Sequence, residues 1–225
     1  PVFNPHPEWE KLLHQRFTEL SEALTGIDFK LYLVNDGSNR QVGIQEVEFL
    51  NNSITRFQYI DQQQNRGKGF ALRQAVKQTS EPYIVYTDAD MPFTLQSMKT
   101  VIAALPHNDV SFGIKQKTYY ELLPLQRKMV SRILQKLIKL LFPSLPVSDT
   151  QCGLKGMNAR GKEIFLQTQI DRYLFDLEFI LYAAKNKLKI RPIPVELRPG
   201  IVFGNMKTRV LLEESRNLWK ILRAK

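Results

Sequence analysis

The sequence predicts an α/β domain with a mostly parallel central sheet flanked by helices, because apolar segments of strand length alternate with amphipathic segments of helix length. Parallel neighbours need long crossover connections, and the helical segments between the strands supply them. The strand pattern is found at 29–34, 56–60, 82–87, 109–113 and 189–197. The helical pattern is found at 8–24, 41–50, 70–78, 94–104, 125–142, 176–187 and 210–223.

Composition narrows the class of protein. The 225 residues are 43% hydrophobic and 24% charged, as is typical of a folded domain. One cysteine, Cys152, and three histidines far apart in the sequence argue against a disulfide framework and against a Cys/His zinc site. No apolar stretch has the roughly 20 residues needed to span a bilayer. These features fit a reducing compartment, and we expect a cytoplasmic protein.

The net charge of +10 indicates an anionic partner, either nucleic acid or a phosphate-bearing lipid. The basic excess is concentrated between residues 115 and 139, where only Glu121 is acidic. The basic residues of this segment are Lys115, Lys117, Arg127, Lys128, Arg132, Lys136 and Lys139. A basic nucleic-acid-binding domain predicts aromatic side chains between the basic ones, but this segment is mainly aliphatic. We therefore expect no nucleic-acid partner.

The predicted helix 125–142 is amphipathic. We expect its apolar side to hold Ile133, Leu134, Leu137, Ile138, Leu140 and Leu141, with Arg132, Gln135, Lys136 and Lys139 opposite. A core-facing stripe with a solvated basic face is the commoner meaning of this pattern. Contact of the helix with a membrane surface is the alternative.

Three polar loops lie at the carboxyl ends of predicted strands, where ligands bind in parallel α/β sheets. The loop TDAD places Asp88 and Asp90 where a turn brings both carboxylates to one Mg²⁺ or Mn²⁺, with diphosphate oxygens completing the shell. The loop NDGS offers Asp36 to a base or ribose, and NRGKG offers Lys68 to a phosphate. Ordinary turn formation is the alternative for the aspartate loops. NRGKG lacks the G-x-G-x-x-G fingerprint, which counts against a dinucleotide-dependent oxidoreductase.

The order of the motifs is more specific than any one of them. NDGS, NRGKGFALRQAV, YIVYTDADMPF, DTQCGLKG and RYLFDLEFILYAA follow one another along the chain. In this order they resemble the inverting glycosyltransferases of family 2, which have the GT-A fold, and among them most closely the dolichyl- or polyprenyl-phosphate glucosyl- and mannosyltransferases. The resemblance implies a single catalytic domain over 1–225, with a nucleotide-sugar half at 1–113 and an acceptor half at 114–225. PVFNP matches the family's loop after its first strand, so we expect a strand to precede it.

The resemblance also implies roles for individual residues. Nucleotide-sugar binding is implied for Pro1, Phe3, Asn4, Asp36, Lys68 and Asp88. Binding of Mg²⁺ or Mn²⁺, the implied cofactor, falls to Asp88 and Asp90. Acceptor binding is implied for Lys115, Arg127, Ser131, Gln151, Arg172 and Glu178. Catalytic roles are implied for Asp90, Asp149 and Asp176.

Two departures from the family pattern concern these roles. Pro92 stands where mannosyltransferases often have a glutamine that helps to hold the metal, and Lys115 stands where they have an arginine. A lysine offers phosphate a point charge instead of a planar fork. For two acceptor-side residues a local role in the next helix is the alternative, with Asp176 as its N-cap and Glu178 in its first turn.

The implied reaction moves a hexose from a UDP- or GDP-hexose to a polyprenyl phosphate of the dolichyl type, at the inner face of a membrane with which the protein makes peripheral contact. A lipid phosphate is already ionised, so cations such as Arg127 and Lys115 are enough to position it. The alternative acceptor is a saccharide hydroxyl in cell-surface polysaccharide synthesis. That reaction needs a base, for which Asp149 or Asp176 is the first candidate.

Overall fold

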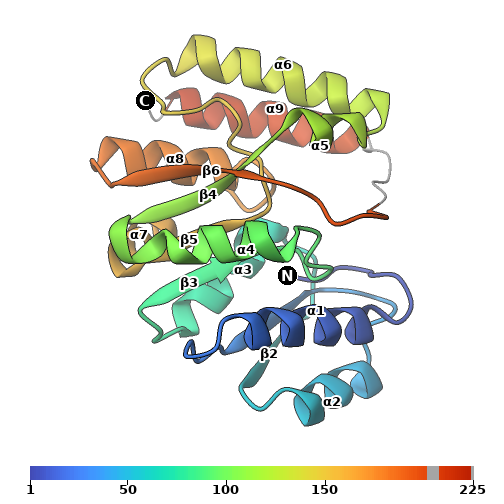
Figure 1. Ribbon diagram of the computed structural model, residues 1–225. Helices are drawn as coiled ribbons and strands as arrows, with labels where there is room; N and C mark the ends of the chain where they lie inside the picture. Colours follow the sequence, from blue (N-terminus) through green and yellow to red (C-terminus); the bar gives the residue numbers. More distant parts are fainter. Residues whose placement is uncertain (202–207, 224–225) are drawn as a thin grey trace.

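The computed structural model describes residues 1–201 and 208–223 as an α/β fold in which helices cover both faces of the strands (Figure 1). The strands are β1 (Leu31–Asp36), β2 (Phe57–Gln62), β3 (Tyr83–Tyr86), β4 (Val110–Lys115), β5 (Lys155–Asn158) and β6 (Ile190–Val195). The first helices are α1 (Trp9–Ala23), α2 (Ile44–Ser53), α3 (Lys68–Gln78), α4 (Leu95–Ala103) and the 3-10 turn η1 (Leu105–His107). The later helices are α5 (Lys117–Glu121), α6 (Leu125–Leu141), α7 (Ala159–Leu166), α8 (Phe175–Lys185) and α9 (Thr208–Arg223).

The strands form two hydrogen-bonded groups. Strands β1 and β2 pair in parallel, with Val34 opposite Ile60. The other four lie in the order β3-β5-β4-β6, in which β4 and β6 are parallel and β5 runs antiparallel to both of its neighbours. The five predicted strands are confirmed. Strand β5 was not predicted, because Lys155 and Gly156 do not give the apolar alternation typical of a strand, although Lys155, Gly156 and Met157 are all buried.

The start of the chain is tied to the end of β1. The backbone N of Val2 donates to Val34 O at 2.8 Å, and the N of Asp36 donates to Val2 O at 2.9 Å. The resulting parallel bridge pairs Val2 with Asn35. Residues 1–4 are therefore held beside the carboxyl end of β1, where Asp36 lies.

Alternation along the strands sends side chains into two large cores, and a small third cluster of Val34, Ala71 and Ala75 lies between β1 and α3. Helices α3, α7 and α8 cover the first core, whose centre is aromatic. Phe165 and Phe179 meet there edge to face, with ring centroids 5.1 Å apart, a favoured geometry for aromatic pairs. Helices α1, α2 and α4 cover the second core, around Leu33, Leu50 and Val101.

Helix α6 packs against the first core through a narrower stripe than expected. Ile138 is 1% exposed, and Leu134 and Leu141 pack partly against the same cluster, to which Leu218 and Ile221 of α9 also belong. Of the six apolar side chains expected on one side of the helix, the core therefore covers only these three of α6, wholly or in part. Large exposed side chains on the helix are instead Leu125, Met129, Ile133, Leu137 and Leu140. The apolar surface of α6 is therefore wider than the part that packs against the first core.

Truncation of Ile138 tests this division of α6. We expect Ile138→Ala to lower the free energy of unfolding by about 2–5 kcal/mol, because it removes buried methyl groups and leaves a cavity. Ile133→Ala, on the same helix but 55% exposed, is the matched control and should change stability by less than about 0.5 kcal/mol. Urea unfolding measures both through the midpoint at constant slope. Equal losses in the two variants would contradict the assignment.

Candidate active site

Asp36, the last residue of β1, fixes the loop that opens α3. Its Oδ1 accepts from the backbone N of Arg66 at 2.9 Å. Its Oδ2 accepts from the backbone N of Gly67 at 2.9 Å and from Asn65 Nδ2 at 3.0 Å. Burial raises the pKa of Asp36 although these amide donors oppose the shift. The carboxylate expected to meet the base is thus held rigidly by groups from NRGKG.

The first residues of the chain lie against the loop that follows β1. The backbone N of Asn4 donates to Ser38 Oγ at 2.9 Å, and the backbone N of Asn39 donates to Asn4 Oδ1 at 3.1 Å. Phe3 between them is half exposed. The structure therefore brings the residues predicted to hold the nucleotide, Pro1, Phe3, Asn4 and Asp36, to one edge of the sheet.

Two glycines let the motif loops approach one another at backbone distance. A Cβ on Gly37, whose φ is +69°, would lie 2.4 Å from the backbone N of Asn65. A Cβ on Gly67, whose φ is +111°, would lie 2.6 Å from Asp171 O. Both positions combine a left-handed backbone with absence of space, so only glycine fits. NDGS, NRGKG and the segment before α8 are packed together as a result.

Lys68 and Asp88 form the central contact of the site. Lys68 is the first residue of α3, and its Nζ lies 2.6 Å from Asp88 Oδ1. Burial by itself would raise the pKa of Asp88, but Lys68 outweighs it and holds that pKa below the ordinary value. Burial likewise opposes the charged form of Lys68, and Asp88 reverses this so that the pKa of Lys68 is raised. Both groups are therefore charged at neutral pH.

Asp90 lies on the outer side of the same turn. The backbone N of Met91 donates to Asp88 O at 2.9 Å, which closes the turn. Burial and then the charge of Asp88 raise the pKa of Asp90. Arg16 of α1 donates to the backbone oxygens of Asp90 and Met91. Sequence reasoning missed Arg16, because nothing in its own helix marks a contact with a residue 74 positions away.

The donor chemistry of this turn fits a divalent cation. Asp88 and Asp90 offer hard carboxylate oxygens, and a cation between them would relieve the repulsion that raises the pKa of Asp90. Gly153 leaves room beside Asp88, since a Cβ there would lie 2.7 Å from Asp88 Oδ2. Among the described residues no group of three His, Cys, Asp or Glu side chains is placed to hold a metal. Remaining ligands would therefore be diphosphate oxygens and water, and the buried Pro92 adds none.

Lys115 and Asp149, predicted separately for acceptor and catalytic roles, form an ion pair. The Nζ of Lys115 lies 3.1 Å from Asp149 Oδ1, and its backbone N donates to Asp149 Oδ2 at 2.7 Å. Burial disfavours the charged form of Lys115, but Asp149 overcomes it and raises the pKa. Tyr120 also donates to Asp149 Oδ2, at 3.4 Å. Asp149 is therefore occupied at both oxygens.

Helix α6 approaches this pair through polar residues near its middle. Gln135 and Ser131 both hydrogen-bond the Tyr120 hydroxyl. Arg127 lies one turn earlier on α6 and is partly buried. The predicted acceptor residues Lys115 and Ser131 are thus linked through Tyr120, which the sequence did not single out.

The three remaining predicted acceptor residues make contacts with other parts of the chain. Arg172 Nε lies 3.0 Å from Glu213 Oε2 of α9, and Gln151 Nε2 donates to Thr150 Oγ1 at 3.3 Å. Glu178 is buried and accepts from the backbone N of Gln169 and of Ile170, at 2.9 and 2.8 Å. The structure gives Glu178 a local contact with the chain before α8 and no opening to solvent.

Asp176 is buried at the start of α8, in contact with Lys155 of β5 and Tyr86 of β3. The helix begins at Phe175 with Leu174 as its N-cap, so the alternative of Asp176 as the cap is wrong; Asp176 lies in the first turn. Sequence reasoning missed Lys155 and Tyr86. The only available signal was the position of Lys155 two residues after DTQCG.

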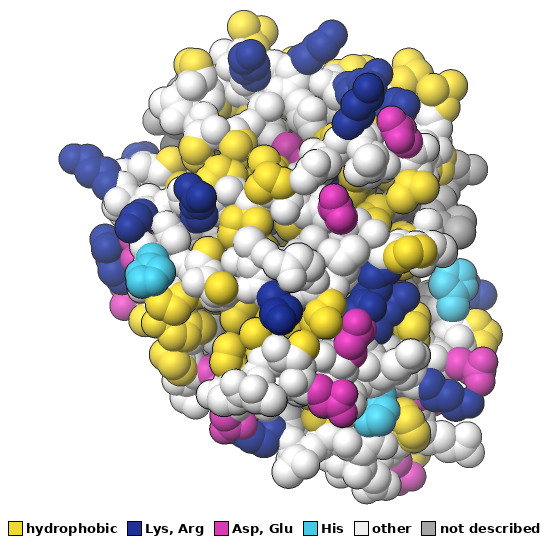
Figure 2. Space-filling view, in the orientation of Figure 1, with side chains coloured by type: hydrophobic (Ala, Val, Ile, Leu, Met, Phe, Trp, Pro, Cys, Tyr) yellow, Lys and Arg dark blue, Asp and Glu magenta, His cyan; other side chains and the backbone are white. Residues whose placement is uncertain are grey.

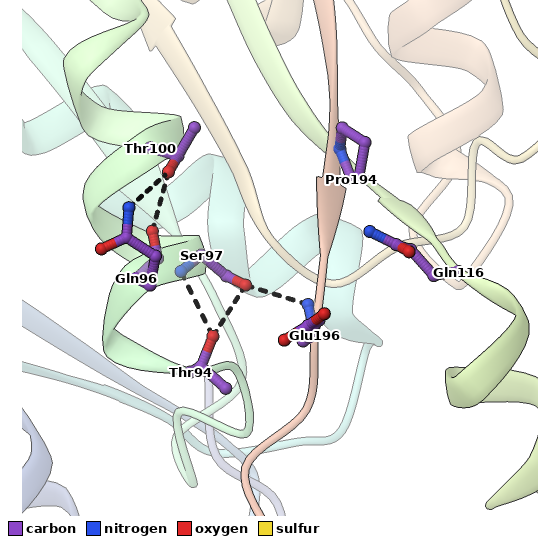
Figure 3. Close-up of a pocket in the computed structure, with 7 residues that line it drawn as sticks. All are labelled: Thr94, Gln96, Ser97, Thr100, Gln116, Pro194 and Glu196. Atoms are coloured by element: carbon purple, nitrogen blue, oxygen red, sulfur yellow. Dashed lines mark hydrogen bonds between the residues drawn. The ribbon is translucent and has the colours of Figure 1, made fainter.

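A separate polar hollow of about 210 Å³ lies between α4, the end of β4 and β6 (Figure 3). Its lining residues are Thr94, Gln96, Ser97, Thr100, Gln116, Pro194 and Glu196. The Ser97 hydroxyl lies 2.8 Å from Thr94 Oγ1 and accepts from the backbone N of Glu196 at 2.9 Å. These groups satisfy one another, and none of the predicted site residues lines the hollow, so the motif loops remain the candidate site.

Comparison with known proteins finds a family model and curated relatives that match most of this chain. A family model described as Glycosyl transferase family 2 matches residues 1–160. The chain is 25% identical over 191 residues to a dolichyl-phosphate beta-glucosyltransferase of Saccharomyces cerevisiae, with 76% of this chain and 57% of that protein covered. It is 22% identical to a dolichyl-phosphate beta-glucosyltransferase of Trichomonas vaginalis, with 98% and 71% covered. The chain thus spans less than two thirds of the length of the yeast relative.

Solved structures share the fold. Glucosyl-3-phosphoglycerate synthase from Mycobacterium tuberculosis in complex with UDP matches with a TM-score of 0.69 at 14% identity, covering 100% of this chain and 77% of that one. The complex of the same enzyme with Mn²⁺, UDP-glucose and phosphoglyceric acid matches with a TM-score of 0.68 at 15% identity, covering 100% and 76%. The expected α/β class and GT-A fold are confirmed.

Filling the space at Gly153 tests the proposed cation site. A methyl group there would push Asp88 away, since its Cβ would lie 2.7 Å from Asp88 Oδ2 and 3.4 Å from Lys68 Nζ. We expect Gly153→Ala to weaken Mn²⁺ binding about tenfold, equivalent to about 1.4 kcal/mol. Titration calorimetry measures this. Gly43→Ala, where a Cβ meets only the flexible Glu46 side chain, is the control; equal Mn²⁺ affinity in both variants and the parent protein would refute the assignment.

Proposed function

This chain belongs to glycosyl transferase family 2, and we propose that it transfers a hexose from a nucleoside-diphosphate sugar to a polyprenyl phosphate of the dolichyl type. The observation that carries the proposal is the contact of Lys68 with Asp88, 2.6 Å apart, beside Asp90 and against Gly153, where only the absence of a Cβ lets Asp88 fit. A cation and paired carboxylates at a strand end suit a diphosphate with its divalent ion. The two curated relatives are named as transferases of this kind.

The donor is assigned to the half of the chain formed by residues 1–113. The nucleoside would lie against Pro1, Phe3, Asn4 and Asp36, and the diphosphate near Lys68. Departure of a nucleoside diphosphate builds negative charge, which the Lys68 ammonium stabilises from a fixed position. Asp88 and Asp90 would hold Mg²⁺ or Mn²⁺, which when bound supplies Lewis-acid stabilisation of the same leaving group.

The acceptor is assigned to the half formed by residues 114–225. An attacking hydroxyl must lose a proton, so it needs a free base within hydrogen-bond reach. Asp149 is engaged by Lys115 and Tyr120, and Asp176 by Lys155 and Tyr86. An ionised phosphate needs no base, only cations to hold it. The occupied carboxylates therefore favour a phosphate acceptor, held by Arg127 and Lys115 with Ser131, over a saccharide hydroxyl.

An assay of transfer tests the proposal directly. The chain is expected to move labelled glucose from UDP-glucose, or mannose from GDP-mannose, to a polyprenyl phosphate in the presence of Mn²⁺ or Mg²⁺, and EDTA should abolish the reaction. Asp88→Asn should reduce the rate at least about 100-fold, the loss expected when charge stabilisation of a leaving group is removed. Asp28→Asn, at an exposed loop, is the control. Transfer to a saccharide but not to the lipid, or transfer that resists EDTA, would overturn the proposal.

A membrane surface is the partner that we propose for α6. Within the described residues no helix has the length and apolarity to cross a bilayer. Helix α6 instead presents the exposed stripe Leu125, Met129, Ile133, Leu137 and Leu140. The helix carries five basic residues and no acidic one, and Figure 2 shows hydrophobic and basic side chains side by side at that end of the molecule. This combination fits peripheral contact with anionic lipid.

Charge placed in the stripe tests the membrane contact. We expect the double variant Met129→Glu/Ile133→Glu to lower the partition onto vesicles of phosphatidylcholine and phosphatidylserine at least about tenfold, because burying each side chain contributes about 1.5–3 kcal/mol. Ile44→Glu is the matched control, since Ile44 is 77% exposed on α2. Vesicle sedimentation measures the partition. Unchanged binding of the double variant would refute the role of α6.

A further inference from the structure

The ammonium of Lys155 is buried among three segments of the candidate site. Its Nζ lies 2.8 Å from Asp176 Oδ1 and donates to Cys152 O at 2.5 Å. The Tyr86 hydroxyl donates to the same oxygen of Asp176 at 2.7 Å. The side chain of Lys155 is 0% exposed and that of Asp176 is 7% exposed. We call these groups, Lys155, Asp176, Tyr86 and the carbonyl of Cys152, the Lys155 cluster.

Each member of the Lys155 cluster adjoins a residue of the donor site. Tyr86 ends β3 two positions before Asp88 and pairs with Lys155 in the β3–β5 register. Cys152 precedes Gly153, where an added Cβ would lie 2.7 Å from Asp88 Oδ2. Asp176 begins α8. A single buried cation therefore connects the D-x-D strand, the DTQCG loop and α8.

The cluster also completes a balance of charge beside the candidate site. Lys68 and Lys155 supply two positive charges, and Asp88 and Asp176 supply two negative ones. Burial opposes the charge on Lys68, but Asp88 first and Asp176 second raise its pKa. An isolated buried charge costs several kcal/mol, so Lys155 and Asp176, whose side chains are 0% and 7% exposed, depend on each other; the side chain of Asp88 is 47% exposed.

We propose that Asp176 is a positioning residue that, through Lys155, holds the DTQCG loop against Asp88 and so preforms the site for the metal and the diphosphate. The inference rests on the proposed function and replaces the catalytic role expected for Asp176. A general base must reach its substrate, whereas Asp176 is buried and shares one oxygen between a lysine and a tyrosine. Stability alone does not account for the cluster, because a buried ion pair is often no better than apolar side chains of similar size.

Variants that remove one or both charges test the proposal. Asp176→Asn and Lys155→Met each leave a buried charge unpaired, and we expect both to lower the midpoint of urea unfolding. The double variant Lys155→Met/Asp176→Asn removes both charges and should recover most of that loss. Tyr86→Phe removes one hydroxyl and leaves the ion pair, so it tests the cluster should the charge variants fail to fold.

Binding of UDP, with and without Mn²⁺, is the readout that separates the roles. In the double variant, we expect the affinity for UDP in the presence of Mn²⁺ to fall about tenfold. In Tyr86→Phe, we expect a smaller fall. In both variants, the affinity for UDP without Mn²⁺ and the shape of the pH–rate profile should stay unchanged. A merely structural cluster predicts wild-type binding of UDP and Mn²⁺ in the recovered double variant. A general base predicts unchanged binding in Asp176→Asn with lost turnover and a lost acidic limb of the pH–rate profile. Either result overturns the proposal.

The control is an ion pair at the surface. Lys11 and Glu8 lie 2.7 Å apart with side chains 62% and 72% exposed. Lys11→Met/Glu8→Gln should leave both stability and UDP binding unchanged. Failure of the proposed function can be told apart from failure of this inference. If the proposed function is wrong, the parent protein itself shows no transfer and no Mn²⁺-dependent binding of a nucleotide-sugar. Failure of the inference leaves the parent protein active.

Discussion

The ion pair of Lys68 with Asp88 is the contact on which the rest of the site depends. It joins the first residue of α3 to the turn after β3, two elements 20 positions apart. Glycines at 37, 67 and 153 allow the loops around it to approach closely, because a Cβ at any of these positions would overlap neighbouring atoms. Backbone contact at this distance leaves little freedom, so the charged groups are held in place before any ligand arrives, as electrostatic stabilisation of a leaving group requires.

Hydrogen bonds and ion pairs also determine which carboxylates of the site are free to bind a ligand. Asp36, Asp149 and Asp176 are each engaged by donors from distant parts of the chain. Asp90 is open to solvent on one side, while partial desolvation by the surrounding chain and then the charge of Asp88 raise its pKa. The carboxylate of Asp90 is therefore open to a metal cation, whereas Asp149 and Asp176, the candidates for a general base, are already paired. This distribution links the geometry to a phosphate acceptor.

Helix α6 joins the acceptor side to the surface. Its inner side packs through Ile138 on the core that α8 and α9 share, and its polar middle contacts Tyr120. Its outer side remains apolar and basic. One helix thus contacts the core, the neighbourhood of Lys115 and the solvent, which is the arrangement needed if a lipid phosphate is to reach a buried cation from a membrane surface.

Much of the framework was available from the sequence alone. Hydrophobic periodicity located the five predicted strands and the long helices, and strand ends located Asp36, Lys68, Asp88 and Asp90, because short-range pattern and turn chemistry decide both. Strand β5 and the short helices α5 and α7 were not predicted. In β5 the reason is that glycine and lysine in a buried strand give no hydrophobic alternation. The order of the motifs gave the family, as a resemblance that the family model bears out.

Only the tertiary structure decided which charges meet. Arg16 contacts the D-x-D turn from 74 positions away, and Asp176 lies 90 positions from Tyr86. Likewise, the sequence predicted the apolar side of α6, but the part of that side that the core covers depends on where α9 packs. Partner choice among distant ionisable groups depends on three-dimensional distance and burial, which periodicity along the chain does not encode.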